Sequence, residues 1–565
     1  MNENVRSRAL LEQHFDIAFA APDGIKKLRE LILTLAMQGK LVPQDPNDQP
    51  ASELLKDIDA EKRRLVKVGK IREPKPLPEI KPDEVPYELP VGWAWVRLGQ
   101  VSDYNGRKNS ISGEIAVDTW LLDLEDIEKD TSRIIYRAQY SERLSTSTKS
   151  TFQKGDVLYG KLRPYLNKVV VADADGVCTT EIIPIVPSSA IDSQFLRWLL
   201  KRPTFLTHVD SLMYGVKMPR LGSDDAVKSI HPLPPLAEQK RIVARIDQLM
   251  ARCDELEKLR AERDRKRLTV HISALNRLFE AQGSDSFTDA WHFINRYFGE
   301  LYSVKANVAE LRKAILQLGV MGKLVPQDPN DQPASELLKE IEAEKRRLVK
   351  EEKIKPQKPL PEIKSEEQPY ALPEGWVWVR LGSFCDKISD GFHHTPKKIS
   401  QGVRYVSATH IYNGRIDWNS GLYVSEGEYL ELYKKTKQGY GDILVVNRGA
   451  GCGDAAIVDT NERFCFQNAA IIGFNQNYVD GQYILYFLHA SRRHFLDKFI
   501  QGGAQPMLSN KLLATHILAL PPLAEQQRIV AKIEKLMALC DQLEQQIDAT
   551  ARKQSVLLNA VMAMI

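Results

Sequence analysis

The most regular pattern of apolar and polar positions lies near the C-terminal end of the chain, where apolar residues recur at alternating steps of four and three. This spacing places them along one side of a helix, as in the seam of a coiled coil. The pattern occurs again near the middle of the chain, and both copies follow a Leu-Pro-Pro sequence, which tolerates a helix start. Two helices of about 40 residues, roughly 60 Å long, are therefore predicted. Their seam residues are Ile242, Ile246, Leu249, Cys253 and Leu256 in one, and Ile529, Ile533, Leu536, Cys540, Leu543 and Ile547 in the other.

Two long helices in one chain can pair with each other antiparallel and serve as a spacer between the parts that they separate. The alternative is that each seam packs only on its own domain, because five or six seam positions are few for a coiled coil. The apolar pattern by itself leaves both arrangements open.

Shorter helices are predicted over residues 26–38 and 308–321, where apolar residues have helical spacing and a glycine follows as C-cap. Each is followed by the segment VPQDPNDQP, whose prolines, Asp and Asn residues predict a fixed turn. A further helix then begins in each copy, with a serine as its expected N-cap. The C-caps are Gly39 and Gly322, and the N-cap serines are Ser52 and Ser335.

These segments belong to a long internal repeat. Residues 28–66 return as residues 311–349, at an offset of 283 (311 − 28), and the stretch GKLVPQDPNDQPASELLK is identical in both copies. LPVGWAWVRLG in the first copy matches LPEGWVWVRLG in the second at the same offset. The helix start LPPLAEQKRIV at residue 233 returns as LPPLAEQQRIV at residue 520, an offset of 287 (520 − 233). A period this long indicates a tandem duplication rather than a solenoid.

Between the repeated blocks, which we call the frame, lie two inserts that are alike in length and barely alike in sequence. Each insert is long enough for a core of its own. Two near-identical frames offer the same docking surface twice, while the two inserts do different things. The predicted division is an N-terminal frame over residues 1–99, a first insert over 100–232, a central frame with a long helix over 233–382, a second insert over 383–519, and a C-terminal helix over 520–565.

Both inserts show short β-type runs between turn residues, at 155–159 and 168–171 in the first and at 441–446 in the second. Helical patterns follow at residues 194–201 and 482–490. The inserts therefore resemble compact α+β domains. The fold class that we expect is α+β, with two such domains in a pseudo-twofold arrangement, separated by the long antiparallel helices that form a coiled-coil spacer.

Length and composition indicate a globular protein of more than one domain, because 565 residues exceed what a single core reaches. The six cysteines include no C-x-x-C pair, the N-terminal segment lacks the apolar run of a secretory signal, and nowhere do 18 apolar residues run together. We therefore expect a cytoplasmic protein without a membrane span. The net charge of +4 is too small to indicate nucleic-acid binding by itself, so any DNA contact has to come from local patches.

Two loops of the first insert have side chains suited to DNA. The sequence GKLRPYLNK combines cations, an amide and an aromatic ring, and MYGVKMPRLG adds small residues that let the backbone approach a partner. Arg can bond a guanine edge with two hydrogen bonds, Asn can do the same for adenine, and Lys binds phosphate. The candidate DNA-binding residues of this insert are Lys161, Arg163, Tyr165, Asn167 and Lys168 in the first loop, and Lys217 and Arg220 in the second.

The second insert offers two corresponding loops and a third near its start. One follows its β-type run, one is the Gly-rich QGGAQPMLS, and one is the segment DGFHHTP near its start. The two histidines lack partners at metal-ligand spacing, so no metal site is expected. Taken singly, each of these residues can also be a solvent-exposed side chain that makes no DNA contact. The candidates are His393, His394, Asn447, Arg448 and Gln505.

The duplicated frame strongly resembles the specificity subunits of type I restriction-modification systems, and the resemblance covers almost the whole chain. It is carried by GKLVPQDPNDQPASELL, LPxGWxWVRLG and LPPLAEQxRIV. The resemblance implies that each insert is a target-recognition domain for one half of a split, asymmetric site in double-stranded DNA. It implies that the frames form the spacer and dock two methyltransferase subunits, which carry S-adenosylmethionine. Two restriction motor-nuclease subunits, which use ATP and Mg, would complete the complex.

No catalytic residue and no cofactor is expected in this chain itself. The sequence has no Asn-Pro-Pro-aromatic methylation motif, no Walker A loop and no credible G-x-G-x-x-G. Two rival functions remain, a self-sufficient DNA methyltransferase with unrecognised motifs and a coiled-coil scaffold that binds only proteins.

Overall fold

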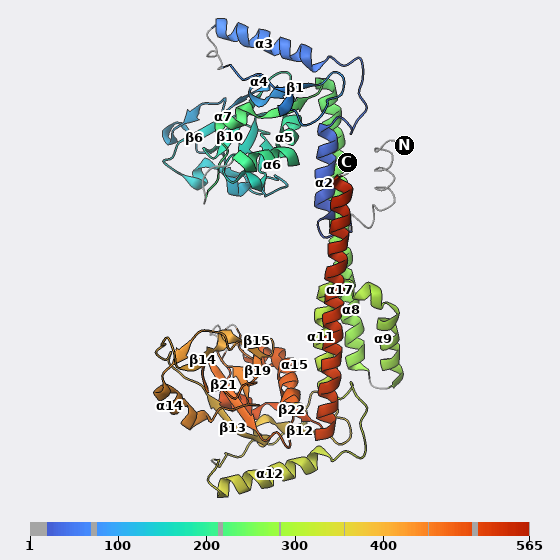
Figure 1. Cartoon of the computed structure of the whole chain (residues 1–565), viewed down its shortest axis with the longest axis vertical. Helices are drawn as coiled ribbons and strands as arrows, with labels where there is room; N and C mark the ends of the chain where they lie inside the picture. Colours follow the sequence, from blue (N-terminus) through green and yellow to red (C-terminus); the bar gives the residue numbers. More distant parts are fainter. Residues whose placement is uncertain are drawn as a thin grey trace. The chain divides into compact units, whose positions relative to one another are not determined.

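The structure is a computed structural model that divides into two compact units, Met1–Arg263 with Thr550–Ile565 and Asp264–Ala549 (Figure 1). Each unit contains one copy of the frame and one insert. The residues described are 20–68, 76–212, 218–281, 284–354, 356–449, 451–499 and 507–563.

Two long helices follow the two Leu-Pro-Pro sequences, as predicted. Helix α8 spans Leu236–Glu280, 45 residues, and α17 spans Leu523–Ala563, 41 residues. Helix α8 begins in the first unit and ends in the second, whereas α17 begins in the second and ends in the first. Both helices are therefore shared between the two units.

The apolar seam of each long helix packs on the shorter frame helix of the same unit. In the second unit, a Cβ atom on Gly319 of α11 (Lys305–Val320) would lie 2.9 Å from Ile533 Cδ1 of α17, so the glycine permits close contact. In the first unit, α2 (Gly24–Met37) shares one core with the seam of α8. The two long helices run in opposite senses between the units, as the predicted antiparallel spacer requires, and each seam also packs on its own unit. The fully buried seam residues are Ile242, Ile246 and Cys253, and Ile529, Ile533 and Cys540.

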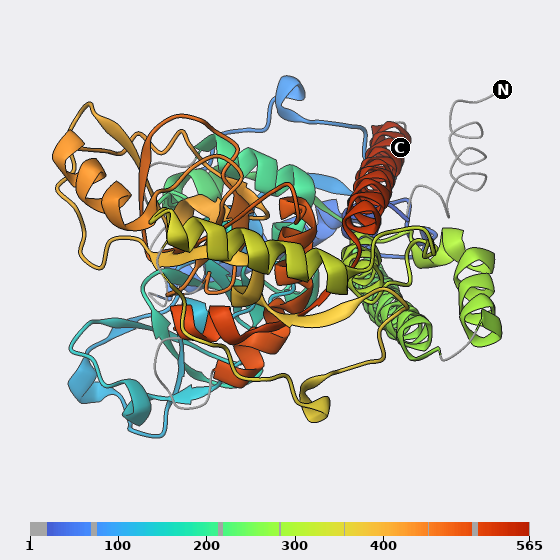
Figure 2. The ribbon, with the colours of Figure 1, turned by 90° about the horizontal axis from the view of Figure 1, so that it is seen from below.

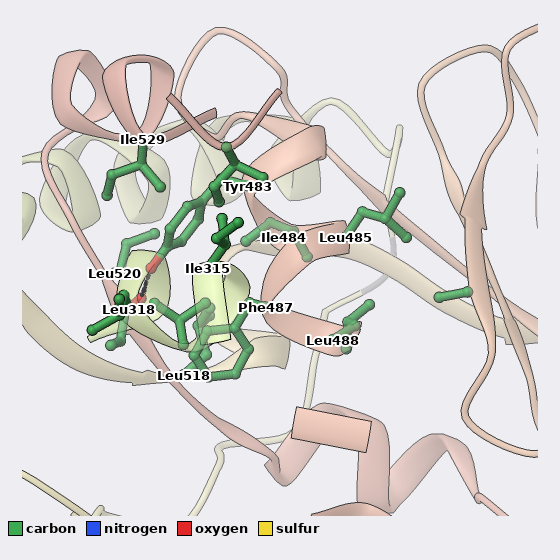
Figure 3. Close-up of a cluster of buried hydrophobic side chains, with 14 of the residues drawn as sticks. Ile315, Leu318, Tyr483, Ile484, Leu485, Phe487, Leu488, Leu518, Leu520 and Ile529 are labelled. Carbon is green, nitrogen blue, oxygen red and sulfur yellow. Dashed lines mark hydrogen bonds between the residues drawn. The ribbon is translucent and has the colours of Figure 1, made fainter. Parts of the chain in front are cut away.

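The core of the second unit joins this frame to its insert. Ile315 of α11 and Ile529 of α17 surround Tyr483 of α15 (Gly481–Phe499), which belongs to the insert (Figure 3). The Tyr483 hydroxyl is fully buried and donates a hydrogen bond to the carbonyl of Ala519 at 2.7 Å. Burial of apolar side chains from both parts stabilises them as one body, at about 25 cal/mol per Å² of apolar surface.

A buried carboxylate at the start of each long helix connects three segments of the frame. Glu238 accepts hydrogen bonds from Trp93 Nε1 at 2.9 Å and from Gln44 Nε2 at 3.2 Å. The tryptophan belongs to the LPxGWxWVRLG motif and the glutamine to the VPQDPNDQP turn. Burial raises the pKa of the Glu238 carboxyl group. We call Glu238 and its counterpart Glu525 the frame carboxylates.

The second unit repeats this arrangement with its own copies of the same residues. Glu525 accepts from Trp376 Nε1 at 2.9 Å and from Gln327 Nε2 at 3.1 Å. Burial raises the pKa of the Glu525 carboxyl group in the same way. The identical geometry explains why the repeated motifs have the same spacing in both frames.

The glutamine next to each frame carboxylate binds the insert. Gln239 Oε1 accepts from the Asp192 amide at 2.8 Å, and Gln526 Oε1 accepts from the Asp480 amide at 2.9 Å. Asp192 is the N-cap of an insert helix, and Asp480 directly precedes another. In the Ala-Glu-Gln sequence at the start of each long helix, the Glu thus connects segments of the frame within one unit, and the Gln connects the frame to the insert.

Each insert is closed by a pair of antiparallel strands from its two flanks. The strand of the LPxGWxWVRLG motif pairs with the strand that leads into Leu-Pro-Pro, so the chain enters and leaves the insert side by side. The pairs are β1 (Ala94–Arg97) with β11 (Ile230–Leu233), and β12 (Val377–Arg380) with β22 (Ile517–Leu520).

The two inserts share one sheet and differ in the other. Both contain a four-stranded antiparallel sheet with the same strand order, β2-β10-β7-β8 and β13-β21-β18-β19. The strands are β2 (Ser102–Tyr104), β7 (Val157–Gly160), β8 (Val169–Val171) and β10 (Ile182–Pro187), and β13 (Cys385–Asp390), β18 (Ile443–Val446), β19 (Ala455–Ile457) and β21 (Ala469–Phe474).

A second sheet has five strands in the first insert, in the order β3-β6-β9-β4-β5, and three in the second, in the order β17-β14-β20. The second insert also contains a two-stranded sheet of β15 (Ile411–Tyr412) and β16 (Arg415–Ile416). Each insert adds helices, so the predicted α+β class is confirmed. The strands are β3 (Asn109–Ser110), β4 (Trp120–Leu122), β5 (Ala138–Gln139), β6 (Lys149–Phe152) and β9 (Gly176–Thr179), and β14 (Val403–Ser407), β17 (Tyr423–Val424) and β20 (Phe464–Gln467). The helices are α5 (Ser193–Lys201), α6 (Pro203–Leu212) and α7 (Ser223–Lys228), and α14 (Glu426–Thr436), α15 and α16 (Asn510–Thr515).

One local prediction is wrong. Helices α3 (Ala51–Lys67) and α12 (Ala334–Lys350) begin before Ser52 and Ser335, and neither serine is the N-cap. Proline holds the cap position instead, in extended geometry, with no side-chain cap hydrogen bond. The first helical amide is satisfied by tertiary structure, since Ala51 N donates to the Gly92 carbonyl at 2.8 Å. The predicted C-caps Gly39 and Gly322 are left-handed, with φ of +70° and +69°, as expected.

The central frame carries an additional helical segment that the sequence pattern did not predict. Helix α9 (Ser284–Arg296) lies beside the end of α8 (Figures 1 and 2), and a groove between them is lined by residues such as Val270, Ala274 and Phe293. None of the described helices is long and apolar enough to cross a membrane.

Replacing Trp376 with Phe tests the frame carboxylates. The change leaves a buried oxygen of Glu525 without its indole donor, which should cost about 1–3 kcal/mol in the free energy of unfolding. Trp418→Phe is a matched control, because the Trp418 indole donates to Asp459 at an exposed site, where water replaces it. Urea unfolding followed by circular dichroism should give a clearly lower midpoint for Trp376→Phe than for Trp418→Phe. Equal midpoints would show that the buried contact is unimportant.

Candidate nucleic-acid interface

The candidate loop of the first insert has an unusual backbone. After β7 ends at Gly160, the chain forms a single 3-10 turn, Pro164–Leu166, between Arg163 and Asn167. Both flanking residues are left-handed, with φ of +50° and +52°. Asn tolerates this conformation, whereas Arg adopts it at a cost that surrounding contacts must offset. The loop is therefore held in shape by its neighbours.

Its two exposed members are Arg163 and Tyr165. The Arg163 side chain is exposed, and 46% of Tyr165 is accessible. Tyr165 sits within the turn and Arg163 directly before it, so both project from the same short segment. A guanidinium and an aromatic ring on one rigid turn suit contact with a nucleic acid.

The second candidate loop of this insert lies against the first. Arg163 N donates to the Pro219 carbonyl at 2.8 Å, and Leu221 N donates to the Lys161 carbonyl at 3.2 Å. Leu162 and Arg220 form an isolated β-bridge. The structure thus brings together two loops that are more than 50 residues apart in the sequence.

Arg220 is bonded within the protein. Its Nε and Nη2 atoms bond the two carboxylate oxygens of Glu181 at 3.0 and 2.9 Å, and this contact lowers the pKa of Glu181. The Lys161 amide donates to the Glu181 carbonyl at 3.0 Å. Arg220 and Glu181 therefore fasten the two loops to the start of β10. A DNA contact by Arg220 would require this ion pair to open or to be shared.

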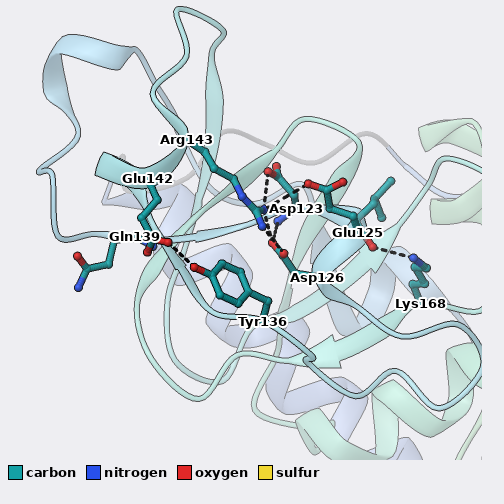
Figure 4. Close-up of polar contacts among 9 residues, drawn as sticks. Asp123, Glu125, Asp126, Tyr136, Gln139, Glu142, Arg143 and Lys168 are labelled. Atoms are coloured by element: carbon teal, nitrogen blue, oxygen red, sulfur yellow. Dashed lines mark hydrogen bonds and ion pairs between the residues drawn. The ribbon is translucent and has the colours of Figure 1, made fainter. Parts of the chain in front are cut away.

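Lys168 and Asn167 are also engaged internally. Lys168 Nζ donates to the Leu124 carbonyl at 2.7 Å, near the network of Arg143 with Asp123 and Asp126 (Figure 4), and burial lowers the pKa of Lys168. The Asn167 carbonyl accepts from Ser132 Oγ at 2.8 Å. Within the described structure these two residues support the loop.

Three segments meet at Asp390, the last residue of β13, in the second insert. Asn447, which directly follows β18, donates from Nδ2 to Asp390 Oδ1 at 2.8 Å, and Asn510 donates from Nδ2 to Asp390 Oδ2 at 2.8 Å. Leu508 N donates to the Asn447 carbonyl at 2.9 Å. Asp390, His393, Asn447 and Arg448 line a small pocket at this point.

The exposed side chains of this cluster are Arg448, His393 and His394. Asn447 is only 7% exposed, and its Oδ1 atom has no hydrogen-bond partner among the described residues. With Nδ2 held by Asp390, the free oxygen is the group that Asn447 can offer to a donor.

The candidate loops of the two inserts have the same backbone arrangement despite their unlike sequences. The loop after β7 bridges from Leu162 to Arg220, and the loop after β18 bridges from Arg448 to Met507. In each case the second residue of the bridge lies just before the last helix of the insert, α7 or α16. An exposed arginine, Arg163 or Arg448, lies in each loop. The two sites are thus equivalent in position and different in chemistry.

Lys217 and Gln505 lie outside the described residues. DNA contact by each of the twelve candidates stays a prediction. Among the residues that the structure describes, no group of three or more His, Cys, Asp or Glu side chains could hold a metal ion.

Sequence reasoning missed the residues that fasten these loops, namely Glu181, Lys201, Asp390 and Asn510. The carbonyl that Lys201 binds in the loop is 34 residues away, and Asn510 is 120 residues from Asp390. No local spacing connects such pairs, so only the tertiary structure identifies them.

Comparison with known proteins places the chain in a family. The family model for the type I restriction modification DNA specificity domain matches residues 90–263 and 373–552, which include both inserts and the starts of both long helices. The chain belongs to this family. It is 36% identical to the type I restriction enzyme EcoAI specificity subunit of Escherichia coli, over 95% of this chain and 93% of that protein. It is 35% identical to the EcoEI specificity subunit of the same organism, with the same coverage.

Among solved structures, the chain is similar to the HsdS subunit from Thermoanaerobacter tengcongensis, with 21% identity and a TM-score of 0.42, over 84% of this chain and 98% of that one. The family relationship confirms the resemblance inferred from the duplicated frame. The chain is a type I specificity subunit with two recognition domains, and as such it is the non-catalytic member of its enzyme.

Replacing Glu181 with Gln should loosen the two joined loops of the first insert. Loss of the carboxylate removes the charge-assisted pair with Arg220, so the Arg163 and Leu221 amides should exchange hydrogen faster in mass-spectrometric measurements. Asp173→Asn is the matched control, because Asp173 pairs with Arg137 at an exposed site of the same insert. Unchanged exchange in Glu181→Gln would mean that the ion pair does not hold the loops.

Proposed function

We propose that each recognition domain reads one half of a bipartite, asymmetric site in double-stranded DNA. The observation that carries this proposal is the pair of bridged loops, which have the same position in both domains and different side chains. Reading different half-sites requires this combination, because the backbone sets the approach to DNA and the side chains select the bases. The related Escherichia coli proteins are named specificity subunits, which agrees with this role.

The side chains best placed for DNA are Arg163 and Tyr165 in the first domain and Arg448 in the second. A guanidinium can bond guanine O6 and N7 in the major groove or bind a phosphate. Because the net charge of the chain is only +4, affinity has to come from such local contacts and from partner subunits.

We further propose that the frame sets the distance between the half-sites and docks two methyltransferase subunits. The two frames repeat the same bonds between glutamate, tryptophan and glutamine, so they offer two like surfaces. In this proposal S-adenosylmethionine is held by the methyltransferase subunits, and two restriction motor-nuclease subunits bring ATP and Mg. In this proposal the present chain recognises the DNA site and sets the distance between its two halves.

Exchanging residues 100–232 for the corresponding segment of another family member should change one half of the methylated site and leave the other half unchanged. The reason is that each insert contains a core cluster made only of its own residues, and its own bridged loops. Mapping methylated bases in DNA modified by the assembled complex measures this directly. Exchange of residues 383–519 is the reciprocal control and should change only the other half. If the first exchange altered both halves, the domains would not act separately.

Arg163→Ala distinguishes a base contact from a phosphate contact. If Arg163 bonds a base edge, discrimination at one base pair should fall by about 1–3 kcal/mol. If it binds phosphate, affinity should fall about equally for all sequences and the salt dependence should become flatter. Competition binding with the assembled complex measures both, and Arg137→Ala in the same domain is the control. No change in any DNA affinity would favour the alternative of a scaffold that binds only proteins.

A further inference from the structure

Lys201 is a buried lysine at the end of α5 in the first recognition domain. Only 4% of the residue is exposed. Its Nζ atom donates to the Asp130 carbonyl at 2.7 Å, to the Asn167 carbonyl at 3.0 Å and to Ser132 Oγ. An ammonium group has three N–H donors, so its hydrogen bonds are complete.

The three acceptors lie on two different segments. Asp130 and Ser132 belong to the turn between η3 (Leu124–Asp126) and β5, and Asn167 ends the 3-10 turn of the candidate DNA-binding loop. These segments also bond each other directly, since Asp130 N donates to the Leu166 carbonyl at 3.1 Å and Ser132 Oγ to the Asn167 carbonyl at 2.8 Å. Lys201 therefore holds the junction of a turn and a loop.

Four residues at this junction have a left-handed backbone. Besides Arg163 and Asn167, both Asp130 and Ser132 are left-handed, with φ of +61° and +59°. Asn and Asp tolerate this conformation, whereas Arg163 and Ser132 adopt it at a cost that their surroundings must offset. The Lys201 ammonium bonds three of these four residues, through the backbone carbonyls of Asp130 and Asn167 and the hydroxyl of Ser132.

A requirement for packing alone would not select lysine at this position. None of its three bonded acceptors is a carboxylate, so the ammonium is buried without a directly paired counter-charge. The pKa of Lys201 is lowered to about 7, mainly by burial and also by the charge of Arg197, while the charge of Asp130 opposes the shift. An apolar side chain would avoid this desolvation. What lysine adds is three directed hydrogen bonds.

We propose that Lys201 is a positioning residue for DNA reading by the first domain. It fixes the turn that presents Arg163 and Tyr165, and it acts through that turn without touching DNA. This inference rests on the proposed function. The second domain joins its loops through Asp390, Asn447 and Asn510 instead, so the effect of Lys201 should be confined to one half-site.

The test uses the full chain with Lys201→Met, assembled with its methyltransferase subunits and supplied with S-adenosylmethionine and genomic DNA. Methionine keeps most of the volume and removes the three donors. Mapping of methylated bases should show a roughly tenfold or greater loss of sequence preference in the half-site of the first domain, comparable to loss of one base contact. Preference in the other half-site should be unchanged.

Lys149→Met is the matched control. Lys149 is also buried in the first domain, at 6% exposure, but it lies on β6 and is not a donor to the junction. Its replacement should leave both half-sites unchanged. Urea unfolding of all three proteins shows whether a loss of preference reflects loss of folded protein.

The pH dependence separates positioning from general support of the fold. Since the pKa of Lys201 is about 7 in the folded chain and near 10.5 when unfolded, unfolding between these values takes up a proton, and the stability that this group contributes rises with pH. The neutral amine has only two N–H donors, so positioning should weaken over the same range. Preference in the first half-site should therefore fall from pH 6.5 to 8.5, relative to the second, and Lys201→Met should abolish this difference.

The outcomes are distinguishable. If Lys201→Met retains full preference in both halves while Arg163→Ala loses it in the first, the positioning role is overturned and the proposed function stands. If Lys201→Met loses preference equally in both halves, the effect is structural and the inference fails. If exchange of residues 100–232 leaves the methylated site unchanged, the proposed function itself fails.

Discussion

At the start of each long helix, a buried carboxylate accepts hydrogen bonds from an indole and an amide that come from distant parts of the frame. Glu238 and Glu525 are each 1% exposed, so these hydrogen bonds form where water cannot replace them. The indole belongs to the strand segment that opens the insert, and the amide to the turn that ends the first frame helix. The neighbouring glutamine then binds the insert. Helix, turn and insert are thus joined at one point in each unit.

This joint allows the rest of an insert to vary. Strands β1 with β11, and β12 with β22, close the two inserts in the same way, and one four-stranded sheet keeps the same order in both. The second sheet and the loops are free to differ, and they do. In the first domain an ion pair and a buried lysine hold the exposed turn, whereas in the second a single aspartate bonds both the loop after β18 and the start of α16. Constant geometry with variable loops is what a subunit with two recognition domains needs.

Much of the frame could be predicted from the sequence, because its signals are local and occur twice. The spacing of Ile529, Ile533 and Cys540 predicts the long helix α17. Gly39 and Gly322 predict where the shorter helices α2 and α11 end. The N-cap prediction was wrong because the Ala51 amide donates to the carbonyl of Gly92, 41 residues away. No local sequence pattern indicates such a contact. The candidate loops were recognised from their composition, but composition does not separate an exposed Arg163 from an Arg220 bonded to Glu181. Lys201 and Asp390 were missed for the same reason, since their partners are distant in sequence.

The central claim is that one chain holds two separate DNA readers at a fixed distance. Its most direct test is to map all methylated bases in the genome of a cell that carries this chain as its only type I specificity subunit. The account predicts a single motif made of two short, different sequences separated by a constant number of unread base pairs. A continuous motif, a symmetric one, or two halves at variable spacing would contradict it.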